Sequence, residues 1–179
     1  AHSTDNEEVA RTLGEVRHRI YIMSSIYNTL YRGDQVKSIH IPSFIYDVTD
    51  SIVQTHTIDT PVMLDRKIDD VWIPAKRSFP MGIIINELVT NAFKYAFNGN
   101  DNGIISITIR QDEDNNLRVT VADNGRGLPD DFKNMSNSGF GLTLVDAMVR
   151  QCRGKYTVSN DCGTRIDIFI PASDDESGN

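Results

Sequence analysis

The sequence NELVTNAFKYAF, residues 86–97, is the stretch around which the rest of the chain is organised. In a helix, residues three and four positions apart lie over one another. Four polar side chains therefore share one face of this helix: Glu87, Asn91, Lys94 and Tyr95. The apolar residues fall mainly on the opposite side, which suits packing against a sheet: Ile85, Leu88, Val89, Ala92 and Ala96. Polar groups on a half-buried helix cost free energy unless they meet a ligand or each other. The pattern fits a ligand-binding helix and also an ordinary amphipathic helix with a polar outer face.

Composition limits the classes of protein to consider. A chain of 179 residues with 39% hydrophobic and 24% charged residues is typical of a soluble domain with an appendage. Its net charge of -7 argues against general binding to nucleic acid or to an anionic membrane. No apolar run approaches the roughly 18 residues of a membrane span, and we expect no signal peptide. Cys152 and Cys162 are too few for a disulfide framework, so we expect reduced thiols in the cytoplasm. The first residue is alanine rather than methionine, so we expect an excised fragment whose parent is soluble or membrane-anchored.

The N-terminal region predicts one long helix. Thr4 and Glu7 form a capping box. Apolar residues then recur every three or four positions until about Tyr31, and Gly33 ends the helix. Such a long apolar seam favours a partner helix and association through a helical bundle. The alternative is a helix that packs only on its own domain.

The rest of the chain predicts strands and helices in mixed order. Strands are expected at 37–41, 62–68, 71–73, 104–110, 117–123, 156–159 and 165–170, with hairpins joining the last two pairs. Helices are expected from Pro42 to about residue 54, from Pro80 through the central stretch, and at 139–151. The apolar positions of the last helix are Leu142, Val145, Ala147 and Met148. The order predicts an α+β sandwich, followed by an acidic, disordered tail at 172–179.

Two glycine-bearing segments follow the central helix. In VTVADNGRGL, residues 119–128, Asp123 ends an apolar strand and Gly125 and Gly127 come next. A buried carboxylate there can accept a hydrogen bond from an exocyclic amine such as that of adenine, and glycines let the backbone pass close to a flat ligand. Taken alone, this segment is also a common turn.

The second segment, SGFGLTL at residues 138–144, places Gly139 and Gly141 just before a helix. Free N–H groups and the helix dipole favour an anion such as phosphate there, although a lone GxG is a weak signal. Between the two segments, residues 126–137 are rich in Asp, Asn and Ser and are typical of a mobile lid. Thr164, which follows Gly163, offers a hydroxyl at the start of the last strand.

Four motifs in order now carry a resemblance: NELVTNAFKYAF, DNGRGLP, GFGLTLV and GTRIDIFIP. They closely resemble the N, G1, G2 and GT boxes of the GHKL ATPase superfamily, in its histidine-kinase branch, over about residues 39–171. The resemblance implies a two-layer α/β sandwich of the Bergerat type preceded by a long dimerisation helix. It divides the chain into the second helix of an incomplete dimerisation and phosphoacceptor hairpin (1–34), the ATP-binding catalytic domain (35–171) and the tail (172–179).

The helix before the catalytic domain resembles the second dimerisation helix and linker of one sensor-kinase subfamily, over residues 19–41. The positions that fit its pattern are Arg19, Ile20, Met23, Ile26, Leu30 and Tyr31. The chain departs from the pattern at Tyr27 and Asn28, where the family often has His and Glu.

The resemblance also implies ATP and Mg²⁺ as ligands and assigns roles to residues. Asn91 would hold Mg²⁺, since a carboxamide oxygen suits a hard cation. Glu87 would orient the attacking group or a metal-bound water, Lys94 would neutralise phosphate charge, and Tyr95 would lie against the nucleotide. Asp123 would accept from the adenine amine, supported by Thr164. The remaining nucleotide-binding residues would be Gly125, Gly127, Gly139, Gly141 and Leu142, the glycines forming backbone walls and lid hinges.

The implied activity is transfer of the ATP γ-phosphate to a histidine and onward to the receiver domain of a response regulator, in a parent protein that dimerises through the N-terminal helix. Residues 15–20, EVRHRI, superficially match the family's phosphoacceptor box, but Tyr21 and Ile22 replace the expected Lys and Asn. The family also has a complete helix between this box and the Leu-Tyr pair before the linker, whereas only about a dozen residues separate the two here. We therefore expect the acceptor outside this chain, with His18 as the alternative; His2, His40 and His56 are expected to be surface or locally bonded residues. Two other classes stay open, namely an anti-sigma-factor-type serine kinase, which lacks a long leading helix, and a nucleotide-binding module without activity. The stimulus, the sensor domain and the particular response regulator are not encoded in these residues.

Overall fold

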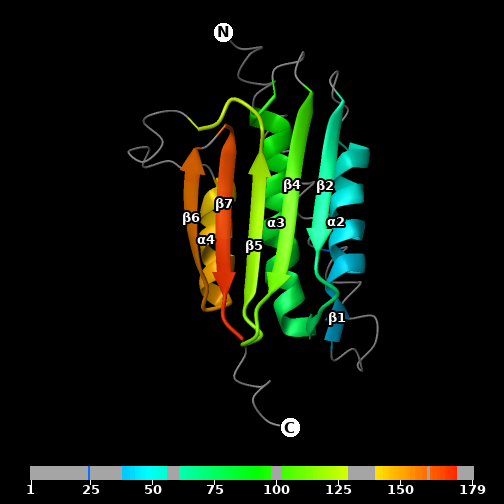
Figure 1. Ribbon diagram of the computed structural model, residues 1–179, viewed down its shortest axis with the longest axis vertical. Helices are drawn as coiled ribbons and strands as arrows, with labels where there is room; N and C mark the ends of the chain where they lie inside the picture. Colours follow the sequence, from blue (N-terminus) through cyan, green and yellow to red (C-terminus); the bar gives the residue numbers. More distant parts are fainter. Residues whose placement is uncertain are drawn as a thin grey trace.

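The computed structural model describes residues 24, 38–55, 61–97, 102–128, 140–160 and 162–172. Their helices and strands follow in the order β1 (Ser38–His40), α2 (Ile41–Thr55), β2 (Val62–Ile68), β3 (Trp72–Pro74), α3 (Ala75–Tyr95), β4 (Gly103–Gln111), β5 (Leu117–Asp123), α4 (Phe140–Gln151), β6 (Lys155–Asn160) and β7 (Thr164–Ile170) (Figure 1). The expected N-terminal helix, apart from Ser24, which is helical, the part of the expected lid after residue 128 and the expected tail after residue 172 lie outside the described residues.

The fold is a two-layer α+β sandwich, as predicted. Five strands form one sheet in the order β2-β4-β5-β7-β6, in which β2 and β4 run parallel and all other neighbours are antiparallel. The three helices cover one face of this sheet, behind the strands in Figure 1. Both expected hairpins, β4–β5 and β6–β7, are confirmed. A small antiparallel pair, β1 with β3, lies beside them.

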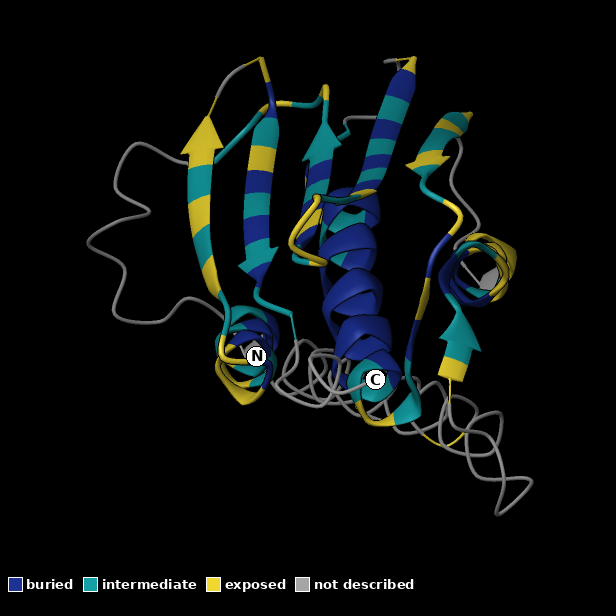
Figure 2. Ribbon diagram, turned by 60° about the horizontal axis from the view of Figure 1, so that its bottom comes forward, coloured by how far each residue is buried: buried dark blue, intermediate teal, exposed yellow. Residues whose placement is uncertain are grey.

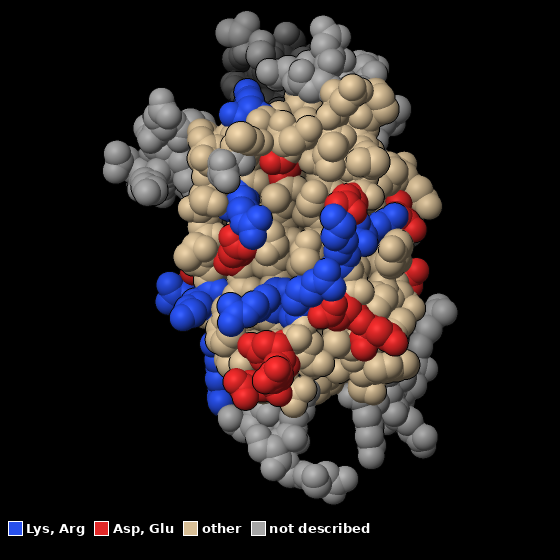
Figure 3. Space-filling view, in the orientation of Figure 1, with Lys and Arg blue, Asp and Glu red and all other residues tan. Residues whose placement is uncertain are grey.

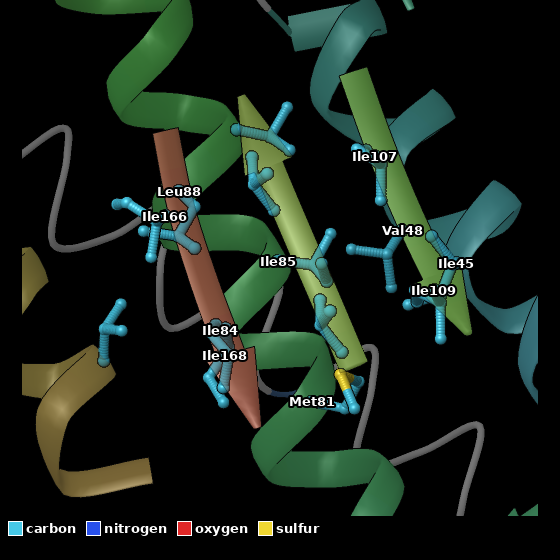
Figure 4. Packing of buried hydrophobic residues seen from close by; sticks show 14 of the residues in the cluster. Ile45, Val48, Met81, Ile84, Ile85, Leu88, Ile107, Ile109, Ile166 and Ile168 are labelled. Carbon is cyan, nitrogen blue, oxygen red and sulfur yellow. The ribbon is translucent and has the colours of Figure 1, made fainter. Parts of the chain in front are cut away.

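Alternating side chains of the central strands build the core. On β4, Ile105, Ile107 and Ile109 are fully buried, and the residues between them point to the other face. The neighbouring strands β5 and β7 repeat this alternation, and their apolar residues pack against α3 (Figure 4). Each such isoleucine contributes about 1.5–3 kcal/mol relative to an exposed one. The two-residue period therefore decides which face of the sheet the helices cover.

The open face of the sheet carries the charged residues of the same strands. Lys and Arg side chains form a band across it, with Asp and Glu beside them (Figure 3). Several of these charges are paired; for example, Arg165 Nε lies 2.7 Å from an oxygen of Asp167. The mixed signs indicate a solvated face.

The central helix begins earlier than predicted. It starts at Ala75, and Pro80 lies inside it rather than opening it. Pro80 lacks the N–H that would donate to the carbonyl of Lys76, so the helix loses one hydrogen bond there. Burial of the surrounding turn outweighs that loss, since Ser78, Pro80 and Met81 are all buried.

Helix α3 is also buried all round along residues 80–90, between α2 and α4 (Figure 2). An ordinary amphipathic helix with a polar outer face is therefore the wrong interpretation of the central stretch. Glu87 is only 1% exposed, although the pattern placed it on the polar side. On α4, Ala147 is exposed, and Val149 takes a buried position instead, as does Cys152 just after the helix.

Two smaller expectations are confirmed. Cys152 and Cys162 are free thiols. His40 is locally bonded, with Nδ1 2.8 Å from Ser43 Oγ and Nε2 2.7 Å from Asp70 Oδ1. Within the described ranges, no helix is both long and apolar enough to cross a membrane.

Candidate functional site

Asp123 ends β5 with its carboxylate held in one orientation. Its Oδ1 accepts the backbone N–H of Gly125 at 2.9 Å and that of Thr164 at 3.2 Å. Among the described residues, no group donates to Oδ2. The side chain is half-buried, so one carboxylate oxygen is tied into the fold and the other is available to a ligand.

Thr164 and Asp123 lie in contact through the Thr164 backbone. The contact uses the Thr164 backbone N–H, whereas the sequence drew attention to its hydroxyl. Gly163, which was not among the predicted site residues, makes this approach possible. Its φ is +127°, and a Cβ there would overlap the Asp123 carbonyl oxygen. The Gly-Thr pair was the available signal, since glycine tolerates both the φ and the close contact.

The glycine turn after β5 packs against the end of α3. The N–H of Arg126 donates to the carbonyl of Ala96 at 2.9 Å. A Cβ at Gly125 would overlap that same carbonyl group, so only glycine fits. The turn that carries Asp123 is thereby joined directly to the helix that carries Asn91, Lys94 and Tyr95.

The polar face of α3 runs from the core to the surface. Glu87 is fully buried, Asn91 and Lys94 are half-buried, and Tyr95 is 56% exposed. Asn86 Nδ2 lies 3.4 Å from Glu87 Oε1. In the part of the chain that the structure describes, Asn86 Oδ1 and Thr90 Oγ1 have no hydrogen-bond partner although both are buried. Each unsatisfied buried group costs about 1–3 kcal/mol.

The start of α4 supplies the last predicted group. Gly141 is buried in its first turn, and Leu142 packs against the core next to α3. Gly139 lies outside the described residues. The structure thus brings the end of α3 and the turn after β5 into contact and packs α4 against α3.

The side chains of this site suit a hard cation that takes most of its coordinating oxygens from a bound phosphate and water rather than from the protein. Within the described residues, no three His, Cys, Asp or Glu side chains gather as a metal cage. Mg²⁺ normally takes one or two protein oxygens and completes its octahedron with phosphate oxygens and water. The half-buried carboxamide of Asn91 can supply one such oxygen.

Comparisons with known proteins agree with this geometry. A family model described as "Histidine kinase-, DNA gyrase B-, and HSP90-like ATPase" matches residues 78–174, and one described as "Histidine kinase" matches residues 1–56. Blue-light-activated histidine kinase 2 of Erythrobacter litoralis is 28% identical over 63% of the chain and 33% of its own length. Sensor histidine kinase PdtaS of Mycolicibacterium smegmatis is 26% identical over 96% of the chain and 35% of its own length. The chain therefore spans about a third of these relatives.

Among solved structures, the histidine kinase domain of the Erythrobacter litoralis EL346 blue-light-activated kinase superposes with a TM-score of 0.74. It is 22% identical, and the match covers 89% of this chain and 77% of that one, which supports the fold. An anti-sigma F factor of Geobacillus stearothermophilus is 33% identical, but only over 35% of the chain.

Proposed function

Because this chain belongs to the histidine kinase-, DNA gyrase B- and HSP90-like ATPase family, in its sensor histidine kinase branch, we propose that it binds MgATP and catalyses phosphoryl transfer to a histidine. This chain is about a third as long as the similar kinases, so the proposal concerns the activity of the whole protein to which it belongs.

The orientation of the Asp123 carboxylate carries the proposal. Two backbone N–H groups hold Oδ1, which leaves Oδ2 to accept a hydrogen bond from the exocyclic amine of adenine. A hydrogen bond to an ionised acceptor is about twice as strong as a neutral one. Adenine is thereby preferred over a base that carries a carbonyl at the same position.

The polar face of α3 serves the phosphates. Bound Mg²⁺ would neutralise charge on the phosphate oxygens. Asn91 would hold the ion through its carboxamide oxygen, Lys94 would offset phosphate charge, and Tyr95 would lie against the nucleotide. Glu87, one turn before Asn91 and buried, would orient the attacking group. Gly125, Gly127, Gly139, Gly141, Leu142 and Thr164 would complete the nucleotide site.

The transfer needs a nucleophile held in line with the γ-phosphorus. An imidazole nitrogen forms the new bond to phosphorus, and the bond to the bridging oxygen of ADP breaks. We propose that this imidazole lies on a dimerisation hairpin of the parent protein, outside this chain. The phosphoryl group then passes to a receiver domain. A domain that uses ATP in this way is expected in the cytoplasm.

Calorimetry tests the binding part of the proposal. Calorimetry with ATP, with and without Mg²⁺, should show binding that Mg²⁺ strengthens, and Asn91→Ala should remove most of the Mg²⁺ effect while ADP without Mg²⁺ still binds. No heat and no thermal shift with millimolar MgATP would overturn the proposed function.

The reaction class follows from labelled ATP and a separately made acceptor hairpin. Acid-labile, base-stable label on the hairpin identifies phosphohistidine. Acid-stable label on a protein serine would instead favour the anti-sigma-factor-type kinase, to which the local similarity to an anti-sigma F factor points. Binding without any transfer would favour the inactive nucleotide-binding module.

A further inference from the structure

Asn160, the last residue of β6, makes a paired contact that no family motif in the sequence accounts for. Its Oδ1 accepts the backbone N–H of Leu128 at 3.1 Å, and its Nδ2 donates to the Leu128 carbonyl at 3.1 Å. A carboxamide presents one acceptor and one donor side by side, as a peptide group does. The Asn160 side chain therefore pairs with the backbone of Leu128 as a residue of a neighbouring strand would, although the two residues are 32 positions apart in the sequence.

The residue before Leu128 is shaped to this contact. Gly127 has a φ of +71°, and a Cβ there would overlap Asn160 Oδ1. Glycine is needed for the backbone angle and for the space that the carboxamide occupies. Gly127 and Asn160 are therefore matched to each other.

The short connection from β6 to β7 holds the glycine turn at both ends. At one end, the Thr164 N–H donates to Asp123 Oδ1 and Gly163 lies against the Asp123 carbonyl. At the other end, Asn160 holds Leu128. In between, Asn124 is hydrogen-bonded to Ile104 and Asn102 at the start of β4, and the Arg126 N–H donates to the Ala96 carbonyl at the end of α3.

We propose that Asn160 is a positioning residue of the nucleotide site. By fixing Leu128, it fixes the path of the turn from Asp123 to Gly127 against the end of α3, on which the placing of adenine depends. This inference rests on the proposed function for its nucleotide part. The holding of Leu128 by Asn160 can be measured without nucleotide.

The first measurement is amide hydrogen exchange without nucleotide. In Asn160→Ala, the Leu128 amide should lose its partner and exchange about tenfold faster or more, because the bond that protects it is gone. In Asn160→Asp, one oxygen still accepts the Leu128 N–H, but the other replaces the donor that faces the Leu128 carbonyl, so protection should fall between that of the wild type and that of Asn160→Ala. Ser159→Ala, an exposed neighbour on the opposite side of the strand, is the matched control and should change neither the exchange nor the nucleotide affinity.

The second measurement is calorimetry with ADP and ATP on the same proteins. Asn160→Ala should bind both about tenfold more weakly with its melting temperature close to that of the wild type, and the affinity of Asn160→Asp should lie between the two, as its Leu128 protection does. Affinity that follows the melting temperature across the variants instead of Leu128 protection would overturn the positioning role. An unchanged Leu128 amide in Asn160→Ala, or a freed amide with unchanged affinity, would overturn it as well. If the wild-type protein binds no nucleotide, the proposed function fails first, and the nucleotide part of this inference fails with it.

Discussion

Replacing Asp123 with asparagine should turn one hydrogen-bond acceptor into a donor while leaving the fold intact. The new side chain has the same shape, and its oxygen can still accept from the Gly125 and Thr164 N–H groups, at the present 2.9 and 3.2 Å. The second carboxylate oxygen becomes an NH₂ group. A donor then faces the adenine amine, which is itself a donor, so the contact is lost.

The size of the effect follows from the kind of bond removed. A hydrogen bond to a charged group contributes about 1.5–3 kcal/mol, and 1.4 kcal/mol is a factor of ten, so ATP affinity should fall about 10- to 150-fold. Inorganic triphosphate, which has no base, should bind as before. Inosine triphosphate carries a carbonyl oxygen where ATP carries the amine, so the substitution should narrow the preference of the site for ATP over inosine triphosphate.

Calorimetry with these three ligands, together with a thermal melt, decides the matter. Asp167→Asn is the matched control, because it removes the same charge from a half-buried carboxylate on the open face of the sheet, where Asp167 accepts from Thr120 and pairs with Arg165. Asp167→Asn should leave all three affinities unchanged. A folded Asp123→Asn protein that binds ATP as tightly as the wild type would refute the assignment of Asp123 to adenine.

Three further outcomes are expected. Gly125→Ala should cost about 1–3 kcal/mol of unfolding free energy in urea titrations, because its methyl group meets the carbonyl at the end of α3; a stability equal to the wild type would contradict that contact. The N–H of Gln111, and then the Arg110 guanidinium, lower the pKa of Asp69 below 3.8, so its stabilising effect is complete above that pH and is lost as the pH falls further. The free energy of unfolding of Asp69→Asn should therefore fall less than that of the wild type between pH 5 and pH 3. Equal losses would show that Asp69 does not contribute to the acid sensitivity. Finally, this chain alone should not phosphorylate itself with γ-labelled ATP; label that appears on the wild type and vanishes in His18→Gln would make His18 the acceptor.

Local patterns were enough to predict most of the sheet. The alternation at 104–110 and 117–123 predicted β4 and β5 to within a residue, because one face of each strand is buried and the other is solvated. The predicted start of α3 was wrong because proline suits the first turn of a helix. Only the burial of the preceding turn shows that the helix begins before Pro80. Burial comes from tertiary packing, which a periodic pattern does not contain.

The site shows the same division. The Asp123 turn was predictable, since a strand end followed by glycines has a chemical meaning in the sequence alone. The role of the Thr164 N–H was not, because every residue except proline has such a group. The Asn160 contact joins residues 32 positions apart, and nothing in the neighbourhood of either one indicates the other. Glu87 was placed on the correct helix but on the wrong side of the boundary between surface and core, since α2 and α4 close over α3.

The one parallel pair in the sheet, β2 with β4, constrains the order in which the chain can fold. The hairpins β4–β5 and β6–β7 close over short connections, so they need little loss of chain entropy before their contacts form. Strand β2 reaches β4 only after the chain has passed through β3 and all of α3. Contacts of such long sequence separation form slowly. Asp123 and Thr164, to which we assign the adenine, lie on different hairpins, and their contact spans 41 residues. The proposed site is therefore complete only when the two hairpins have paired with each other and the crossover has brought α3 to Arg126.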